Sequence, residues 1–336
     1  MPRSFGPIAD LDAWRARALD KIADRTVVCS ISGGKDSTAM ALLLKEAEIP
    51  FISVHLDTGW EHRLTEEYVF DYLPTVLGPI QIARRPGGGM ADLVRQSAGF
   101  PGGNQRFCTR DLKIKPIKAF LDAMDTEPIN TVGIRSGESI KRAAMPEWEY
   151  SDPLKCSVWR PIKPWSEEDV FAMHRRHGVK PNPLYEMGAL RVGCWPCIFA
   201  RKSEIKMLAD TDPERIDVIR RLEEEVQEIR RVRDEKRGRE GNHVPTWFAH
   251  KKASWSIDDV VAWSRSTPED LRYRPLFDGD DPASDARNRM ATLREELFVA
   301  PVREQGCMRW GMCETVSPQE EKMDEFSRLW QLAGDP

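Results

Sequence analysis

The chain has 336 residues, with 50 Lys and Arg against 54 Asp and Glu, and 40% of its residues are hydrophobic. Its length predicts about two domains, and the near balance of charge excludes a generally basic nucleic-acid-binding protein. No apolar stretch approaches the roughly 20 residues of a transmembrane helix, so we expect no membrane span. The first 25 residues show no apolar signal-peptide core, which favours a cytoplasmic protein.

Strand and helix patterns alternate through the first 134 residues. Short β-branched runs predict strands, and apolar residues recurring every three or four positions predict helices. The expected strands are 26–31, 51–56, 79–83 and 129–134, and the expected helices are 37–45, 65–73, 90–97 and 113–124. This alternation is typical of βαβ units, so we predict an α/β fold with a doubly wound parallel sheet.

The second half of the chain is mostly helical in pattern. Capping residues at Ser166, Asp212 and Ser256 each predict the start of a helix. Residues 158–162 are expected to be an edge strand or an extended lead-in. We therefore divide the chain into a first domain, 1–200, and a mostly helical region, 201–336. The helix after Ser166 carries His174 and His177, which we expect on an exposed face rather than in a metal site.

Seven cysteines in a chain of this length are too few for a disulfide scaffold. Such usage indicates a reducing compartment, where cysteines bind metals, catalyse reactions or are simply buried. Cys29 lies inside the first expected strand and is predicted to be a small buried apolar residue. The pattern assigns no role to Cys156.

Six consecutive polar or glycine residues, Ser32-Gly-Gly-Lys-Asp-Ser37, lie between the first expected strand and the next helix. The unpaired N–H groups and the dipole of a helix N-terminus attract anions at such a junction. Two glycines let the backbone approach a phosphate, and Lys35 adds positive charge. The spacing is neither that of a Walker A loop nor that of a dinucleotide-binding motif. We favour a phosphate-binding loop over the alternative, a plain tight turn.

This segment resembles the PP-loop of the ATP pyrophosphatase superfamily, in its full Ser-Gly-Gly-Lys-Asp-Ser form. Four further segments resemble the phosphoadenosine phosphosulfate reductase-like branch of that superfamily: His55–His62 with Asp57-Thr-Gly, Arg106–Lys113, Gly133–Arg142, and Gly193-Cys-x-x-Cys197. In the second of these, the arginine follows the cysteine by two positions rather than three. The resemblance covers about residues 26–200 and implies that the first domain is a PP-loop nucleotide-binding domain.

The resemblance also implies a set of site residues. The catalytic residues would be Lys35 and Asp36, and Mg²⁺ would lie near Asp36 or Asp57. The ATP-binding residues would be Ser32, Gly33, Gly34, Lys35, Asp36, Ser37, Asp57, Thr58, Gly133, Arg135 and Glu138. The substrate-binding residues would be Arg110, Lys113 and Arg142. Two alternatives stay open: the Asp57 segment is a turn, and Arg135, Glu138 and Arg142 are an ion-paired helix face.

A metal centre is the second expected feature. Cys194-x-x-Cys197 has the spacing of a metal knuckle, in which two thiolates on one turn reach one ion or cluster. Cys108 stands at a matching position of the family. The resemblance implies a [4Fe–4S] cluster, with structural zinc as the alternative. The four ligands would be Cys108, Cys194, Cys197, and Cys313 or Cys307.

Two locally basic segments, 105–118 and 230–240, are candidates for contact with the phosphate backbone of tRNA or DNA. The alternative for both is a solvated helix face. A cysteine desulfurase or another sulfur donor is a further expected partner. The sequence leaves the oligomeric state open.

Together, these features favour an ATP pyrophosphatase that adenylates a substrate for sulfur transfer, with a nucleic acid as acceptor. The resemblance is to the DNA phosphorothioation and sulfur-transfer members of the superfamily. A reductase of adenylyl sulfate or phosphoadenylyl sulfate is the first alternative. That reading is weakened because Lys35 and Asp36 are present and the reductases' C-terminal Glu-Cys-Gly tail is absent. A non-catalytic nucleotide-binding subunit of a modification or defence complex is the second.

Overall fold

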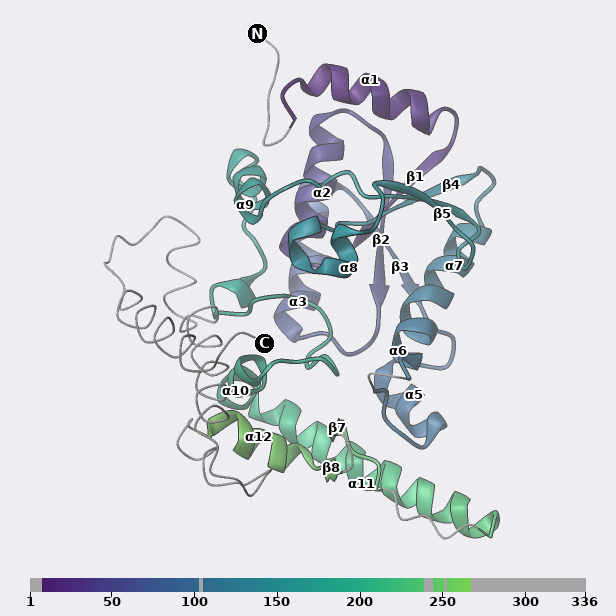
Figure 1. Cartoon of the computed structure of the whole chain (residues 1–336), viewed down its shortest axis with the longest axis vertical. Helices are drawn as coiled ribbons and strands as arrows, with labels where there is room; N and C mark the ends of the chain where they lie inside the picture. Colours follow the sequence, from purple (N-terminus) through teal and green to yellow (C-terminus); the bar gives the residue numbers. More distant parts are fainter. Residues whose placement is uncertain (1–7, 103–104, 239–243, 251–252, 267–336) are drawn as a thin grey trace, which may run out of the picture.

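A six-stranded sheet with the strand order β3-β2-β1-β4-β6-β5 forms the centre of the first part of the chain (Figure 1). The computed structural model describes residues 8–102, 105–238, 244–250 and 253–266. The strands are β1 (Thr26–Ile31), β2 (Phe51–Asp57), β3 (Ile80–Arg84), β4 (Pro128–Thr131), β5 (Trp148–Ser151) and β6 (Cys156–Trp159).

Five of these strands are parallel, and β5 runs antiparallel to β6. The edge-strand prediction for residues 158–162 is therefore wrong, because β6 pairs with β4 on one side and β5 on the other. The edge strand at this end of the sheet is β5, which the sequence did not indicate. Its hairpin to β6 turns at Lys155, whose φ of 56° is a left-handed conformation set by the turn rather than by a glycine.

Helices cover both faces of the sheet, which confirms the doubly wound α/β prediction. On one face, α1 (Leu11–Ile22), α2 (Lys35–Glu46) and α9 (Glu167–Arg176) pack over alternate residues of β1. On the other face, α7 (Lys115–Asp122) covers Val28, Val54 and Val158. Residues 39–44 of α2 are each 0% exposed, because this helix lies between the sheet and α9.

Short helical segments connect these elements, and three longer helices follow them. The connecting segments are α3 (Arg63–Glu67), η1 (Tyr68–Tyr72), α4 (Leu73–Leu77), α5 (Met90–Ser97), α6 (Phe107–Thr109), η2 (Arg110–Ile114), η3 (Ser136–Glu138), α8 (Ile140–Ala143) and η4 (Pro183–Tyr185). The later elements are α10 (Lys202–Thr211), α11 (Pro213–Lys236), the hairpin β7 (Phe248–His250) with β8 (Ala253–Trp255), and α12 (Ile257–Arg265). None of the helices in these described ranges combines the length and apolar character needed to cross a membrane.

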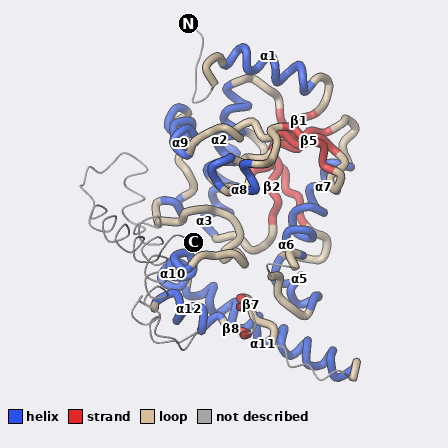
Figure 2. The backbone as a smooth tube through the Cα atoms, viewed as in Figure 1, coloured by secondary structure: helices blue, strands red, loops and turns tan. Residues whose placement is uncertain are grey.

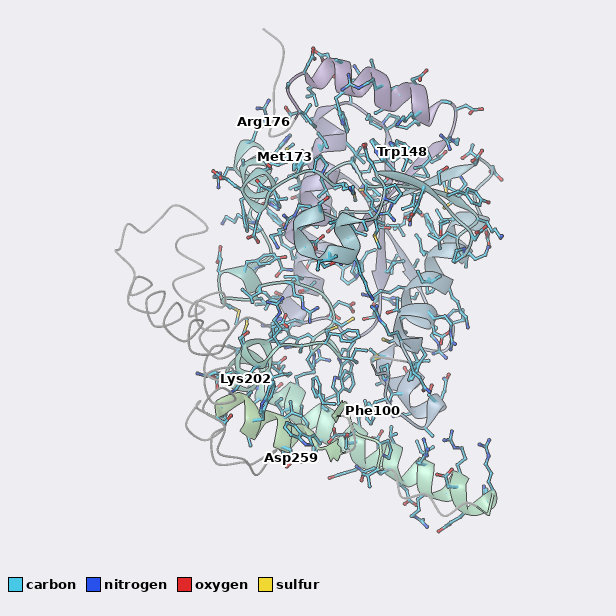
Figure 3. The ribbon with its side chains drawn as sticks, in the orientation of Figure 1. Phe100, Trp148, Met173, Arg176, Lys202 and Asp259 are labelled. Carbon is cyan, nitrogen blue, oxygen red and sulfur yellow. The ribbon has the colours of Figure 1, made fainter. Side chains whose placement is uncertain are left out.

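The helices α10, α11 and α12 form a layer beside the sheet domain (Figure 2). Helix α11 packs on α5, and the rings of Trp60 and Trp247 stack at 4.7 Å. Phe100 also contacts Trp247 and lies where the two parts meet (Figure 3). One apolar core thus crosses residue 200, and the division at that residue stays a prediction.

Inside this layer, the buried carboxylate of Glu223 on α11 organises the chain that follows it. Its two oxygens accept hydrogen bonds from the backbone N–H groups of Trp247, at 2.9 Å, and Ile257, at 3.0 Å. Burial raises the pKa of Glu223, and these two backbone hydrogen bonds oppose that rise. One side chain thereby fixes both the β7 hairpin and the start of α12 on α11.

The strand order reverses around β1, since β2 and β3 extend the sheet on one side and β4 extends it on the other. In open α/β sheets, ligands bind beyond the carboxyl ends of the strands at such a reversal. The segment 32–37 directly follows β1 and leads into α2. The fold therefore places this segment at the position where such sheets bind ligands.

Candidate functional site

The loop 32–34 turns sharply between β1 and α2, and Gly33 makes the turn possible. Its φ is +73°, and a Cβ atom at this position would stand 2.8 Å from Cγ2 of Val69. Any other residue would meet both the conformational penalty and this contact with η1. The loop is thus closely packed on its outer side, which holds its backbone in one conformation.

Hydroxyl groups brace the same loop from within. Ser37 Oγ donates to the carbonyl oxygen of Gly34 at 3.0 Å and accepts from the backbone N–H of Ser32 at 3.1 Å. The two hydroxyls of Ser32 and Ser37 are themselves 3.1 Å apart. In this conformation, the expected ATP-binding hydroxyls hold the loop together.

Lys35 begins α2, and its side chain is buried, with 5% exposure. The ammonium nitrogen lies 3.3 Å from Oδ2 of Asp36 and 3.4 Å from Oε1 of Glu167. It also stands 5.1 Å from the centre of the Tyr185 ring, which is a cation–π distance. The two carboxylates offset the charge of this ammonium, so an anion at the first turn of α2 would compete with them for it.

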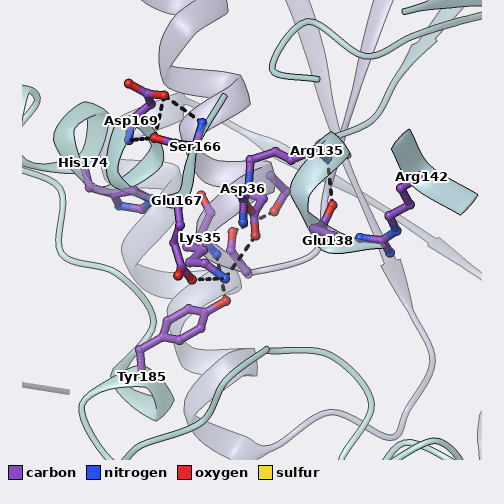
Figure 4. Close-up of polar contacts among 12 residues, drawn as sticks. Lys35, Asp36, Arg135, Glu138, Arg142, Ser166, Glu167, Asp169, His174 and Tyr185 are labelled. Carbon is purple, nitrogen blue, oxygen red and sulfur yellow. Dashed lines mark hydrogen bonds and ion pairs between the residues drawn. The ribbon is translucent and has the colours of Figure 1, made fainter. Parts of the chain in front are cut away.

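A continuous polar network extends from Lys35 to α8 (Figure 4). Asp36 pairs with the guanidinium of Arg135, whose side chain is 8% exposed. The backbone N–H of Arg135 donates to Oε2 of Glu138 at 2.8 Å, and Glu138 pairs with Arg142 one helical turn later. The structure therefore brings five of the sequence-predicted site residues together.

Gly133 has a packing role at this network. A Cβ atom on it would stand 2.9 Å from the backbone carbonyl of Asp36 and 2.9 Å from Cα of Ser37. The chain after β4 can approach α2 this closely only without a side chain. Gly133 thereby lets Arg135 reach Asp36.

Four residues that sequence reasoning missed hold the loop from residues 167–185. Besides Glu167, His174 Nε2 lies 2.9 Å from the carbonyl oxygen of Lys35, and Asn182 Nδ2 donates to the carbonyl oxygen of Gly33 at 3.2 Å. The hydroxyl oxygen of Tyr185 accepts from the backbone N–H of Lys35 at 3.1 Å. Their sequence carries no signal beyond the cap of α9, since each contact spans more than a hundred residues.

The prediction that His174 lies on an exposed face is wrong. The side chain is 1% exposed, because α9 packs against α2 along the face that bears His174. Burial lowers the pKa of His174, while its hydrogen bonds to the carbonyl groups of Lys35 and Val179 oppose that change. His177 is half-buried and contacts Glu46.

The second strand ends in a compact turn at Asp57 and Thr58. Asp57 Oδ1 accepts from the backbone N–H of Gly59 at 2.7 Å, and Oδ2 contacts Nε of Arg84 at 2.5 Å. Thr58 is fully buried and donates to Oε1 of Glu61 at 2.7 Å. The turn interpretation of this segment therefore describes its geometry.

The two carboxylates proposed to hold Mg²⁺ do not fit a protein-held metal site. Asp57 is paired with Arg84, and Asp36 is paired with both Lys35 and Arg135. A carboxylate so neutralised is a poor ligand for a hard cation. Across the described ranges, no three His, Cys, Asp or Glu side chains form a group able to hold a metal ion.

Two of the candidate cysteine ligands, Cys108 and Cys194, pack against the same apolar cluster, and with Cys197 they affect the pKa of Lys113 on η2. Coulombic interaction with Cys194 is the first cause that raises the pKa of Lys113, and Glu61, Cys197 and Cys108 contribute in the same direction. Burial raises the pKa of Cys194, and Lys113 opposes that rise. Cysteine thiolates are suitable ligands for zinc or an iron–sulfur cluster. The described residues alone, however, do not form a group able to hold a metal ion. Cys307 and Cys313 lie outside the described residues.

Cys29 and Cys156 lie in other apolar clusters than Cys108 and Cys194. Cys29 is fully buried in β1, which confirms its assignment as a core residue, and burial raises the pKa of its thiol. Cys156 is buried on the opposite face of the sheet with α7.

Several cations of the two basic segments pair with neighbouring acids. Arg110 and Lys115 both pair with Asp111, and the hydrogen bond from Arg110 is the first cause that lowers the pKa of Asp111 to about 2. On α11, Arg230 pairs with Asp234, and Arg231 pairs with Glu228 and Glu235. These pairs describe solvated helix faces in the described part of both segments.

Comparisons with known proteins identify the family of this fold and loop. An uncharacterised 37.8 kDa protein of Escherichia phage 186 is 36% identical over 246 residues, covering 58% of this chain and 73% of the phage protein. The adenosine 5'-phosphosulfate reductase of Allochromatium vinosum is 35% identical over 92 residues, covering 27% of this chain and 34% of that reductase. The crystal structure of phosphoadenylyl-sulfate reductase from Candida auris aligns at 14% identity with a TM-score of 0.44, over 56% of this chain and 95% of that chain.

A match to the phosphoadenosine phosphosulfate reductase domain covers residues 26–200. This range includes the whole sheet, the loop 32–37 and the cysteines Cys108, Cys194 and Cys197. It amounts to more than half of the 336 residues. The chain therefore belongs to the phosphoadenosine phosphosulfate reductase domain family.

Proposed function

We propose that the protein is a nucleotide-binding enzyme that cleaves ATP between the α and β phosphates and adenylates a substrate for sulfur transfer. One observation carries this proposal. The buried ammonium of Lys35 and the first-turn amides of α2 lie together beyond β1, where the strand order reverses. This arrangement supports a polyphosphate site, because amides, dipole and cation all favour negative charge.

The proposed first step is attack by a substrate oxygen on the α-phosphorus atom. A new oxygen–phosphorus bond forms, and the bond from the α-phosphorus to the bridging oxygen breaks. Pyrophosphate leaves with that electron pair, and Lys35 with the loop amides balances the charge that develops on it. Mg²⁺ enters as the counter-ion of the ATP substrate, and Asp36 orients Arg135 beside the loop.

In the proposed second step, a sulfur nucleophile displaces AMP from the activated substrate. Its sulfur would come from a cysteine desulfurase or another donor protein, and the acceptor would be a tRNA or DNA. A [4Fe–4S] cluster or a zinc ion on Cys108, Cys194, Cys197, and Cys313 or Cys307 belongs to this proposal as well. Its support is the Cys194-x-x-Cys197 spacing, together with the packing of Cys108 and Cys194 against the same apolar cluster. We assign no step to that centre.

Reduction of adenylyl sulfate is a second candidate, favoured by the match to adenosine 5'-phosphosulfate reductases. Such an enzyme would cleave no bond between phosphates, because adenylyl sulfate carries a single phosphate joined to sulfate, and its products would be sulfite and AMP. Loss of sulfite from adenylyl sulfate in the presence of a thiol reductant would support it.

The deciding experiment measures pyrophosphate release from MgATP, with and without tRNA or duplex DNA as acceptor. We expect pyrophosphate from the wild-type chain and none from Lys35→Gln, with AMP released only when a sulfur donor is also present. The matched control is Lys45→Gln, because Lys45 is exposed in the last turn of the same helix, α2. Production of ADP and orthophosphate would contradict cleavage between the α and β phosphates. Tight ATP binding without any cleavage would instead indicate a non-catalytic subunit.

A further inference from the structure

The backbone amide of Lys35 has an acceptor within the protein. Amides in the first turn of a helix have no intrahelical acceptor, which is why they bind anions. Here, the amide of Lys35 donates to the phenol oxygen of Tyr185 at 3.1 Å. A phosphate oxygen that binds this amide must therefore take the place of the Tyr185 hydroxyl.

The ammonium of Lys35 is also engaged within the protein, by its neighbour Asp36 at 3.3 Å and by a residue of α9. Its nitrogen lies 3.4 Å from a carboxylate oxygen of Glu167, the first residue of α9. This carboxylate oxygen and the phenol oxygen of Tyr185 approach the two groups of Lys35 that a polyphosphate would use (Figure 4). Both are oxygen acceptors, and one is an anion.

The segment that carries Tyr185 is firmly placed. Asn182 caps it by accepting from the backbone N–H of Leu184 at 3.0 Å, and its amide donates to the carbonyl oxygen of Gly33 at 3.2 Å. Tyr185 itself is 4% exposed, and its hydroxyl lies 3.5 Å from where a Cβ of Gly34 would stand. These contacts hold the Tyr185 hydroxyl against the loop 32–34.

We propose that Tyr185 and Glu167 form an internal clamp that occupies the phosphate-binding groups of Lys35 and that a polyphosphate must displace. This inference rests on the proposed function, since it concerns the same loop. The clamp acts as a selectivity filter for ligand charge. A ligand must replace a hydrogen bond and an ion pair at once, so a triphosphate or pyrophosphate displaces it and a single phosphate group does so poorly.

Substituting a residue of the clamp should strengthen ligand binding, whereas substituting a residue that contacts the ligand would weaken it. Tyr185→Phe removes the competing acceptor and leaves the Lys35 amide to the ligand. We expect this variant to bind the magnesium complex of α,β-methylene-ATP about fivefold more tightly than wild type, the effect of one neutral hydrogen bond. Glu167→Gln should tighten binding about threefold, since a partly exposed ion pair contributes less.

Matched controls separate the clamp from general changes in the fold. Tyr72→Phe removes a hydroxyl that accepts from the backbone N–H of Lys180, upstream of Asn182 and outside the loop. Glu168→Gln makes the same charge change as Glu167→Gln at the next, exposed position of α9. Both controls should bind the analogue as wild type does. Thermal unfolding of each variant checks that the fold is retained.

Calorimetric titration of the full chain with the analogue and with inorganic pyrophosphate decides the question. Tighter binding by Tyr185→Phe and Glu167→Gln supports the clamp. Binding by wild type with equal or weaker binding by both variants overturns the clamp alone, because both residues would then be neutral or would assist the ligand. No binding by any variant overturns the proposed function and the clamp together.

Discussion

Asp36 and Arg135 are 99 residues apart in sequence, yet Asp36 Oδ1 accepts a hydrogen bond from Nε of Arg135. The contact joins the first turn of α2 to the chain that follows β4. Both partners are largely shielded from solvent, with side-chain exposures of 16% and 8%. An ion pair in such surroundings is costly to break from one side, because the remaining charge stays buried.

Removing the carboxylate should therefore destabilise the protein more than removing its charge alone. We expect Asp36→Ala to lower the free energy of unfolding by about 3 kcal/mol. Asp36→Asn, which keeps an acceptor for Arg135, should lower it less. Urea denaturation of these variants, of Arg135→Met and of the double variant Asp36→Ala with Arg135→Met measures the coupling. Strictly additive free energies would show that the two side chains do not act as a pair.

The buried His174 predicts a loss of stability in mild acid. Its pKa is lowered from 6.5 in the folded protein by burial, while Asp36 raises it and Lys35 lowers it further. The neutral ring then contributes stability that is complete above pH 6.5 and is lost as the pH falls through the lowered folded value. We expect the urea midpoint of wild type to fall between pH 7.5 and 5.5.

The variant His174→Gln should show a smaller fall over the same pH range, because its amide keeps a donor for the carbonyl oxygen of Lys35 and does not titrate. His62, whose pKa burial also lowers, accounts for part of the remaining fall. Equal pH profiles for His174→Gln and wild type would contradict the assignment.

Cys108, Cys194 and Cys197 predict metal content in protein purified without oxygen. We expect bound iron in wild type and its loss in Cys194→Ser and Cys197→Ser, because each variant removes a soft ligand from the proposed centre. Cys156→Ser should retain the metal, since Cys156 is buried in a different apolar cluster from Cys108 and Cys194. Elemental analysis for iron and zinc is the measurement. One equivalent of zinc in colourless protein would replace the cluster by a structural ion.

Nucleic-acid binding should depend steeply on salt and on exposed cations near the site. Lys141 is exposed on α8, beside the Arg142–Glu138 pair, and it lies next to Ile140, which is 91% exposed. We expect Lys141→Glu to weaken the binding of tRNA or duplex DNA, whereas Lys118→Glu, on α7, should weaken it less. Fluorescence anisotropy across a salt series tests both. Equal effects of the two variants would remove α8 from the interface.

Local signals account for what the sequence could predict. The capping residues Ser166, Asp212 and Ser256 each begin a helix in the structure, because a cap depends on neighbours within one turn. The strand–helix alternation likewise indicated the sheet and the position of the loop after β1. The resemblance pointed to the family to which the chain belongs.

The contacts that complete the site join residues far apart in the sequence, so local sequence patterns do not predict them. Tyr185 meets Lys35 across 150 residues, and His174 does so across 139 residues. Which face of α9 becomes buried depends on α2, so the pattern of α9 alone gave the wrong side for His174. The ion pairs of Asp57 and Lys115 also follow from the arrangement of neighbouring elements.

The stack of Trp60 on Trp247 shows that the apolar core extends beyond the segment that matches the family. The segment shared with the family ends at residue 200, whereas Trp60, Leu93 and Val94 are covered by side chains that come after it. A recombinant fragment limited to the shared segment would expose this apolar face to water and favour aggregation. Chimeras with relatives should therefore exchange α5 and α11 together, because these two helices pack against each other.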